Sequence, residues 1–206
     1  MFCMMDHNNI LGTVLAGGKS QRFGEDKSQV KLNGKLLIDY ILSEIIDEFK
    51  EILIVSNNQI KYKNYKNISL INDLKKDQGP LGGVLSAMKW AKEKNDKYKW
   101  ISTFPVDTPF FKKDILQKFL SEIDSEESKL FFIKSNNTRH NIFGIWSIDL
   151  MKKLEHDLNE GQRKVEVWAN SVGVKVINME FINKDPFFNI NTKEEMEKAK
   201  EKINYD

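Results

Sequence analysis

Cysteine is nearly absent from this sequence, and so are long apolar runs. Cys3 is the single cysteine among the 206 residues, which excludes an intramolecular disulfide and a metal site built from cysteines. A lone cysteine is also typical of a reducing compartment. Residues 1–9 include Asp6 and lack the apolar core of a secretory signal. No apolar run approaches the roughly 20 residues that span a bilayer, so we expect a cytoplasmic protein with no membrane partner.

An excess of one charge is missing too. Lys and Arg together number 32 and Asp and Glu 30, which leaves a net charge of +2 and gives no case for general nucleic-acid binding. The hydrophobic fraction of 40% is enough for a packed core and argues against disorder. No repeat, low-complexity segment or Pro/Gly/Ser-rich linker divides the chain, so we predict one domain over residues 1–206.

Strand-like and helix-like segments alternate along the chain. We expect strands at residues 10–16, 51–56, 68–71, 100–106, 130–134, 142–146 and 174–179. We expect a turn-rich loop at 77–83 and helices at residues 36–49, 84–94, 113–123, 148–158 and 163–171. A capping box, Thr192 with Glu195, opens one more helix. This alternation predicts an α/β fold with a mainly parallel sheet, whose ligand lies beyond the carboxyl ends of the strands.

The first expected strand runs into a loop rich in glycine and cations. Gly17 and Gly18 let the backbone approach a ligand closely, and free N–H groups in such a turn bind anions. Lys19, Arg22 and Lys27 add three cations, which suit phosphate oxygens. An ordinary surface loop with lysines explains the same composition, so the pattern leaves both interpretations open.

Neither standard phosphate-binding motif accounts for this loop. The Walker A pattern needs a glycine five residues before Gly18, where Thr13 stands. The dinucleotide-binding pattern G-x-G-x-x-G is absent as well. If the loop binds phosphate, it does so as part of another motif.

A single acid follows the expected strand at residues 100–106. Asp107 stands at the tip of this apolar run, and Pro109 stops the strand just beyond it. A rigidly held carboxylate suits Mg²⁺, which prefers carboxylate and phosphate oxygens and offsets charge during phosphoryl-group transfer. Taken alone, an acid that turns the chain or caps a helix is the commoner explanation.

The glycine-rich loop resembles a family signature. Nucleotidyltransferases with a Rossmann-like fold carry L-A-(A/G)-G-x-S-x-R-(M/F)-G followed by a (P/D)-K pair, and the chain matches it from Leu15 to Gly24 and at Asp26-Lys27. The L-A-G-G and Asp-Lys forms resemble the molybdenum cofactor guanylyltransferases, the MobA-like branch. The next segment is similar to that branch's L-x-G-K-P-L, with Leu36 where proline is usual.

This resemblance implies a three-layer α/β/α sandwich with a nucleotide-binding part at about 10–110 and an acceptor-binding part at about 111–206. Lys27, Arg22 and Asp107 would be catalytic, and Asp107 would hold Mg²⁺. GTP would contact Leu15, Ala16, Gly17, Gly18, Lys27, Ser56, Asp73, Gly82 and Asp107. Gly82 belongs to a G-P-L-x-G segment that a tight turn before a helix explains as well.

Two carboxyl-terminal segments resemble the family's acceptor site. The F-N-I-N-T stretch is similar to the family's N-x-N-T-P-E element and implies that Asn189 and Asn191 line the active site, although helix capping explains the second asparagine too. The G-Q-R-K-V stretch is similar to G-x-R-(R/K)-V and implies that Arg163 and Lys164 meet the acceptor. A solvated helix face explains this cationic pair as well.

The residues Arg139-His140-Asn141 fall where the family usually shows His-Pro, and Asn141 departs from that pattern. We expect His140 to be a hydrogen-bonded structural residue rather than a catalyst.

The implied reaction transfers GMP from GTP to the phosphate of molybdopterin or Mo-molybdopterin and releases pyrophosphate. The attacking phosphate is already an anion near neutral pH, so positioning and charge neutralisation suffice without a general base. Molybdoenzymes and other proteins of cofactor biosynthesis would be transient partners. Two alternatives stay open: a sibling enzyme that uses CTP or a sugar or polyol phosphate, and a non-catalytic carrier of the finished cofactor.

Overall fold

A seven-stranded sheet forms the middle of the molecule, with the strand order β5-β4-β1-β6-β8-β7-β9. The computed structural model describes residues 7–17, 30–63, 65–74, 78–125, 128–181 and 185–204. The strands are β1 (Ile10–Leu15), β4 (Ile52–Val55), β5 (Ile68–Ile71), β6 (Trp100–Pro105), β7 (Leu130–Ser135), β8 (Thr138–Ser147) and β9 (Lys175–Asn178). Only β8, among these, runs antiparallel to its neighbours. The prediction of an α/β fold with a mainly parallel sheet is therefore confirmed.

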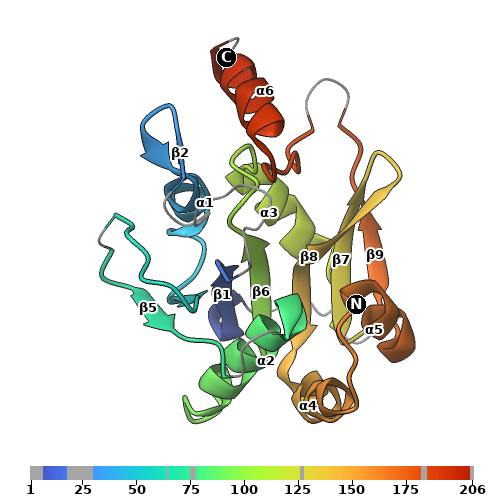
Figure 1. The fold of residues 1–206 in the computed structure, drawn as a ribbon. Coiled ribbons are helices and arrows are strands. Elements are labelled where there is room, and N and C mark those ends of the chain that lie inside the picture. The colour runs from blue at the N-terminus through green and yellow to red at the C-terminus, as the bar shows by residue number, and fades with distance from the viewer. Residues whose placement is uncertain are drawn as a thin grey trace.

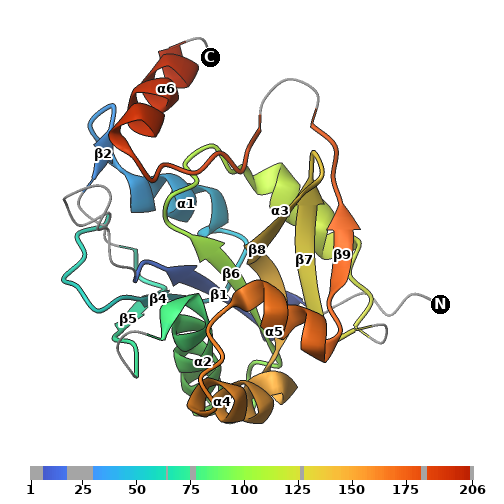
Figure 2. The same ribbon diagram turned by 45° about the vertical axis from the view of Figure 1, so that its right-hand side comes forward.

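Helices cover both faces of this sheet (Figures 1 and 2). On one face lie α1 (Leu37–Ile45) and α3 (Lys113–Ser121). On the other lie α2 (Gly79–Lys92), α4 (Met151–Asn159) and α5 (Val165–Val172). The last helix, α6 (Lys193–Asn204), packs near a small separate hairpin of β2 (Lys31–Leu32) and β3 (Lys35–Leu36). Within the described ranges, no helix is both long and apolar enough to cross a membrane.

The central strand β1 is apolar on both faces, as a covered parallel strand should be. Ile10 and Val14 belong to the core under α1 and α3, whereas Leu11 and Leu15 belong to the core under α2 and α4. Alternate side chains of a strand point to opposite faces, so one short run supplies both cores. The two buried clusters hold the ends of the central strands in a fixed arrangement.

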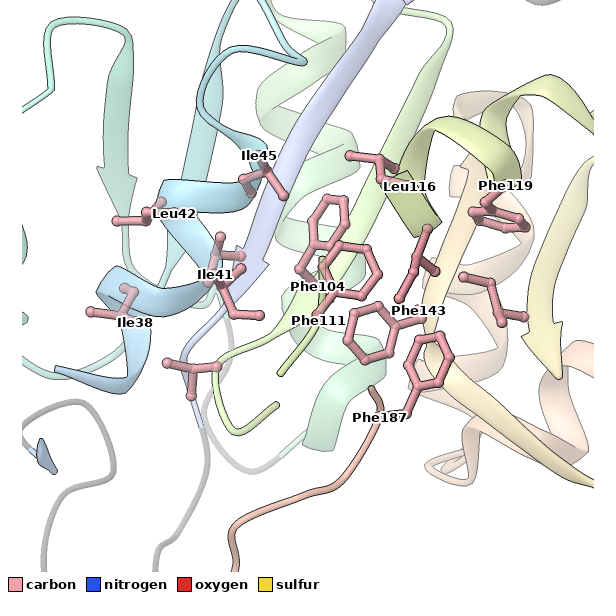
Figure 3. Close-up of a cluster of buried hydrophobic side chains, with 14 of the residues drawn as sticks. Ile38, Ile41, Leu42, Ile45, Phe104, Phe111, Leu116, Phe119, Phe143 and Phe187 are labelled. Atoms are coloured by element: carbon pink, nitrogen blue, oxygen red, sulfur yellow. The ribbon is translucent and has the colours of Figure 1, made fainter. Parts of the chain in front are cut away.

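A group of aromatic rings fixes the segment before α6 against the sheet (Figure 3). Phe111 from the loop after β6 stacks on Phe143 of β8, with ring centroids 4.9 Å apart. Phe187 meets Phe143 edge to face, also at 4.9 Å. Such offset and edge-on pairs are the favoured aromatic geometries. Because Phe187 is buried here, the residues that follow it are held close to the sheet.

The predicted loop at residues 77–83 is wrong, because α2 begins at Gly79. Pro80 fits the first helical turn, where its missing N–H would have no partner in any case. Gly83 lies inside this helix and faces β1. A Cβ added there would lie 3.1 Å from Leu15 Cδ2 and 3.4 Å from Asp73 Oδ1, which explains why a glycine stands at this position. Glycines that look like turn residues in the sequence therefore allow a helix to pack closely on β1.

Three other predicted elements have different bounds in the structure. The expected strand at 142–146 extends over Thr138–Ser147, because Asn136 and Asn137 both adopt positive φ, at 46° and 64°, and form a tight hairpin turn after β7. The helix expected at 36–49 ends at Ile45. The helix expected at 148–158 is divided into a 3₁₀ turn, Ile148–Leu150, and α4.

Candidate active site

The chain path creates a switch point between β1 and β6. From β1 the chain proceeds outward through β4 and β5 and then returns to β6 on the other side of β1. Right-handed crossovers in opposite directions put α1 and α2 on opposite faces, which leaves a crevice beyond the carboxyl ends of the two central strands. A cleft of about 440 Å³ opens there, lined by residues 15–17, Pro80, 105–107, 138–143 and Asn189.

Four polar or small residues follow the strand ends at equal distance. Gly17, Asn57, Asp73 and Asp107 each stand two residues beyond the last residue of β1, β4, β5 and β6, respectively. Parallel strands end at one edge of a sheet, so this spacing brings the four residues to the same edge. The nucleotide-site residues that the sequence implies at Gly17, Asp73 and Asp107 therefore share one edge.

Asp73 is half-buried and held from two sides. Asn57 donates its Nδ2–H to Asp73 Oδ2 at 3.2 Å and accepts the backbone N–H of Asp73 through Oδ1 at 3.1 Å. The Ser86 hydroxyl lies 3.5 Å from Asp73 Oδ1 but donates more closely to the Gly82 carbonyl, at 2.9 Å. Burial raises the pKa of the Asp73 carboxyl above its ordinary value, and the bonds from Ser86 and Asn57 oppose that rise. The fold thus keeps a desolvated acceptor group at the edge of the sheet.

Gly17 leaves no room for a side chain beside this carboxylate. A Cβ added at Gly17 would lie 3.2 Å from Asp73 Oδ2, which is tighter than ordinary van der Waals contact. The neighbouring Ala16 donates its backbone N–H to the Val55 carbonyl at 3.0 Å. The turn after β1 is therefore fastened to β4 and packed directly against Asp73.

Asp107 is one of the residues that line the cleft. Its backbone carbonyl accepts the Ile190 N–H at 2.9 Å, and this bond ties the segment before α6 to the tip of β6. Asn189, the preceding residue, lines the same cleft. Of the described residues that line the cleft, Asp107 is the one carboxylate. One carboxylate together with substrate phosphate oxygens is the donor set that suits Mg²⁺, so the residue fits the metal role that the sequence implies.

The far wall of the cleft is an irregular stretch of β8. Phe132 pairs with Gly144, but the next residue, Ile133, pairs with His140, so residues 141–143 bulge out of the ladder. The Thr103 hydroxyl donates to the Ile142 carbonyl inside the bulge. It also accepts the Nε1–H of Trp146 at 2.7 Å. Bulges commonly redirect side chains next to active sites, and this one faces the cleft.

His140 is hydrogen-bonded, as expected. Its Nε2 is 2.7 Å from the Ser135 hydroxyl, and its ring stacks on Phe187 with centroids 4.1 Å apart. Burial lowers the pKa of His140, and the charge of Asp185 opposes that shift. The ring is therefore held in its neutral form at neutral pH, with one nitrogen already engaged.

The cationic pair implied for the acceptor lies elsewhere. Arg163 donates from Nη1 to the backbone carbonyls of Leu158, at 2.6 Å, and Gln162, at 2.7 Å. Its guanidinium therefore caps the carboxyl end of α4. Lys164 is exposed and immediately precedes α5. Neither is among the described residues that line the cleft.

Two further implied residues have local bonding roles. Ser56 is fully buried, and its hydroxyl accepts the backbone N–H of Asn58 at 3.1 Å. The backbone N–H of Asn191 donates to the Glu195 carboxylate at 2.6 Å. Glu195 in turn donates its N–H to the Thr192 hydroxyl at 3.1 Å and accepts that residue's N–H at 2.9 Å. The predicted capping box is confirmed.

Three implied site residues, Gly18, Arg22 and Lys27, lie outside the described residues. Two residues in the site were not singled out as functional from the sequence. The family resemblance implies a nucleotide contact at Ser56, and Asn57 is the next residue along the chain. Arg139 stands on β8 next to the bulge, which has no sequence signal.

The crevice at the switch point and its lining define a Rossmann-like α/β domain of the nucleotidyltransferase type. The family model described as "MobA-like NTP transferase domain" matches residues 12–172 of this chain. The chain belongs to this MobA-like NTP transferase family.

Individual relatives agree with that membership. A protein of Haemophilus influenzae named molybdenum cofactor guanylyltransferase is 31% identical, over 92% of this chain and 97% of its own. A probable molybdenum cofactor guanylyltransferase of Aquifex aeolicus is 28% identical, over 90% of this chain and 87% of its own. The crystal structure of molybdopterin-guanine dinucleotide biosynthesis protein A from Archaeoglobus fulgidus has the same fold, with a TM-score of 0.74 at 22% identity over 95% of this chain and all of that one.

Proposed function

We propose that this chain transfers GMP from GTP to the terminal phosphate of molybdopterin, with or without molybdenum, and releases pyrophosphate. The product is the guanine dinucleotide form of the cofactor. The observation that carries the proposal is a single cleft that joins the turn after β1, Asp107 and Asn189. Relatives named for this activity align over nearly the whole chain. We place the reaction in the cytoplasm.

GTP binds, in this proposal, over the turn at residues 15–17 with its base toward Asp73. Guanine carries N–H donors along one edge, and a half-buried carboxylate is their matching acceptor. Asn57 holds that carboxylate in place and takes the position next to Ser56, which is buried. Lys27 and Arg22 would lie near the triphosphate, as the family signature implies.

Asp107 would hold Mg²⁺ in this cleft. Such an ion supplies positive charge that offsets the negative charge of the transferring phosphate. The backbone bond from Ile190 to Asp107 keeps the carboxylate-bearing residue and Asn189 in one rigid unit.

In the transfer step, an oxygen of the acceptor phosphate attacks the α-phosphorus of GTP. A new phosphorus–oxygen bond forms, the bond from the α-phosphorus to the bridging oxygen breaks, and pyrophosphate leaves with the electron pair. The nucleophile is an anion near neutral pH, so no residue has to remove a proton. This agrees with the neighbourhood of His140, whose Nε2 is taken up by Ser135.

A nucleotide panel tests the proposal. The purified protein is incubated with Mg²⁺, molybdopterin and each of GTP, CTP, ATP and UTP, and pyrophosphate release is measured. Release with GTP alone is the expected result. Release with CTP instead would make the chain a sibling cytidylyltransferase. If none of the four nucleotides gave pyrophosphate, a cofactor-binding carrier would be favoured. Sugar and polyol phosphates replace molybdopterin in a parallel series.

A further inference from the structure

Arg139 is a largely desolvated cation in the wall of the cleft. It is the second residue of β8 and lines the cleft together with Asp107 and Asn189. Only 18% of its side chain is exposed. A guanidinium removed from water needs hydrogen-bond partners and a counter-charge to offset the loss of hydration.

Two neutral amides hold the guanidinium plane. Arg139 donates from Nε to Asn141 Oδ1 and from Nη1 to Asn170 Oδ1, both at 2.8 Å. Asn141 stands in the bulge of β8 and Asn170 on α5, so two different elements fix the fork. Amide oxygens orient the group but leave its positive charge uncancelled.

The remaining donors of Arg139 are incompletely used. Its Nη2 is buried and has no hydrogen-bond partner within the described part of the chain. The carboxylate oxygen of Glu166 lies 3.6 Å from Nη2, beyond hydrogen-bond distance, on a side chain that is 69% exposed. Because Glu166 is solvated and lies at this distance, the ion pair is weak. The arginine therefore carries more N–H donors than the described residues accept.

Other cations do not fill this role in the described cleft. Arg163 is engaged with backbone carbonyls at the end of α4, and Lys164 is exposed outside the cleft. Among the described lining residues, Arg139 is the one that carries a positive charge.

We infer that Arg139 binds the anionic group of a phosphorylated pterin acceptor, an inference that rests on the proposed function of the cleft. Asn141 and Asn170 are positioning residues, because they orient the guanidinium without reaching the reacting atoms. The acceptor end of the site is thus built on the amino end of β8 and braced by α5. Asn141, which replaces the family's usual proline, supplies one of the two braces.

A binding experiment without nucleotide tests this assignment. The probe is 6-hydroxymethylpterin monophosphate, and its dissociation constant is measured by pterin fluorescence for wild type, Arg139→Ala, Arg139→Lys and Lys134→Ala. Lys134 is the matched control, because it is the cross-strand partner of Arg139 in the same hairpin and is not among the described cleft residues. A charged hydrogen bond corresponds to roughly a 10- to 100-fold weaker binding in the alanine variant, an intermediate loss in the lysine variant and no change in the control.

Steady-state kinetics separate a binding role from a structural one. Arg139→Ala is expected to raise KM for molybdopterin while KM for GTP stays within about twofold. Asn170→Ala, which keeps the arginine, raises KM for molybdopterin by a smaller factor. Should Arg139→Ala fail to fold by circular dichroism, Asn170→Ala and Arg139→Lys carry the same test.

The outcomes distinguish this inference from the proposed function. Equal probe affinity in wild type and Arg139→Ala, or no binding by either, overturns the inference even if GTP-dependent transfer is observed. Lost probe binding in Arg139→Ala, combined with no pyrophosphate release from any nucleotide, supports the inference and overturns the transferase function. An unchanged KM for molybdopterin in an active Arg139→Ala enzyme also overturns the inference.

Discussion

The two ends of the cleft are built in opposite ways. At the nucleotide end, Gly17 packs closely against Asp73 and Gly83 against Leu15, and an added methyl group would lie 3.2 and 3.1 Å from those side chains. At the acceptor end, Arg139 and Asn141 are long or polar side chains on a strand that leaves its ladder. Close packing recognises a ligand by shape, whereas an oriented cation recognises it by charge. Under the proposed function, this difference predicts that the nucleotide is selected by close fit around the Asp73 acceptor and the pterin by its phosphate.

The largest expected effect lies between the two ends, at Asp107. Asp107→Ala should reduce transfer by about 10²- to 10³-fold, the usual cost of removing one group that stabilises transition-state charge. The melting temperature should change little, because the backbone bond from Ile190 to residue 107 does not need the carboxylate. Pyrophosphate release and a thermal melt measure the two quantities. Turnover within a few-fold of wild type would remove Asp107 from the mechanism.

Gly17→Ala should damage the nucleotide end alone. The new Cβ would lie 3.2 Å from Asp73 Oδ2, so the carboxylate must shift, and overpacking of this kind corresponds to a roughly tenfold rise in KM for GTP. KM for molybdopterin should stay unchanged, which is the reverse of the pattern expected for Arg139→Ala. If both variants raised both constants, the division of the cleft into two ends would be wrong.

Asp73→Asn should separate stability from function. Burial raises the folded pKa of Asp73 above its ordinary value of 3.8, so the folded protein binds more protons than the unfolded chain between those two values. Stability therefore falls as the pH rises through that window, and the cost of the buried charge is fully present above it. The variant lacks this cost.

We expect Asp73→Asn to melt at a higher temperature than wild type at pH 7, with the gap closing as the pH falls through the same window. Its KM for GTP should rise roughly tenfold, because a neutral amide is a weaker acceptor. Thermal melts across a pH series, together with GTP kinetics at pH 7, measure both. A lower melting temperature for the variant at every pH would show that the carboxylate stabilises the fold.

The smallest effects come from two threonines that are register partners on neighbouring strands, Thr13 on β1 and Thr103 on β6. Both are fully buried. The Thr103 hydroxyl bonds to Ile142 and Trp146, so Thr103→Val leaves those groups unsatisfied and should cost about 1–3 kcal/mol. The Thr13 hydroxyl has no hydrogen-bond partner among the described residues.

Thr13→Val should therefore be neutral or stabilising, within about 1 kcal/mol. Urea unfolding of the two variants compares the same substitution at paired positions. Because Thr103 fastens the bulge of β8, its variant should also raise KM for molybdopterin, which Thr13→Val should not. Equal losses of stability in both variants would contradict the bonding described for Thr103.

The sequence predicted those parts of the molecule that depend on local pattern. Alternating apolar runs gave the strands, and residues just beyond β1 and β6, Gly17 and Asp107, fall in the cleft as expected. The start of α2 was wrong because Gly83 is required by contact with Leu15, which no local pattern encodes.

Three further features of the site depend on contacts that the sequence does not show. Arg163 carries the family's cationic signature, but the local path of the chain after α4 turns its guanidinium onto Leu158. The role proposed for Arg139 depends on α5 as well, because Asn170 on that helix accepts a hydrogen bond from its guanidinium. Asn57 was passed over for its neighbour because nothing in the sequence shows which of two adjacent residues faces the edge of the sheet.

The most direct test of the account follows the phosphorus atoms of GTP. The protein is incubated with Mg²⁺, molybdopterin and GTP that carries a radioactive phosphorus at either the α or the γ position, and the products are separated by chromatography. The account predicts that the α label appears in the pterin dinucleotide and the γ label in pyrophosphate. An α label that remains in GTP, or that appears only as free GMP, would contradict guanylyl transfer at this cleft.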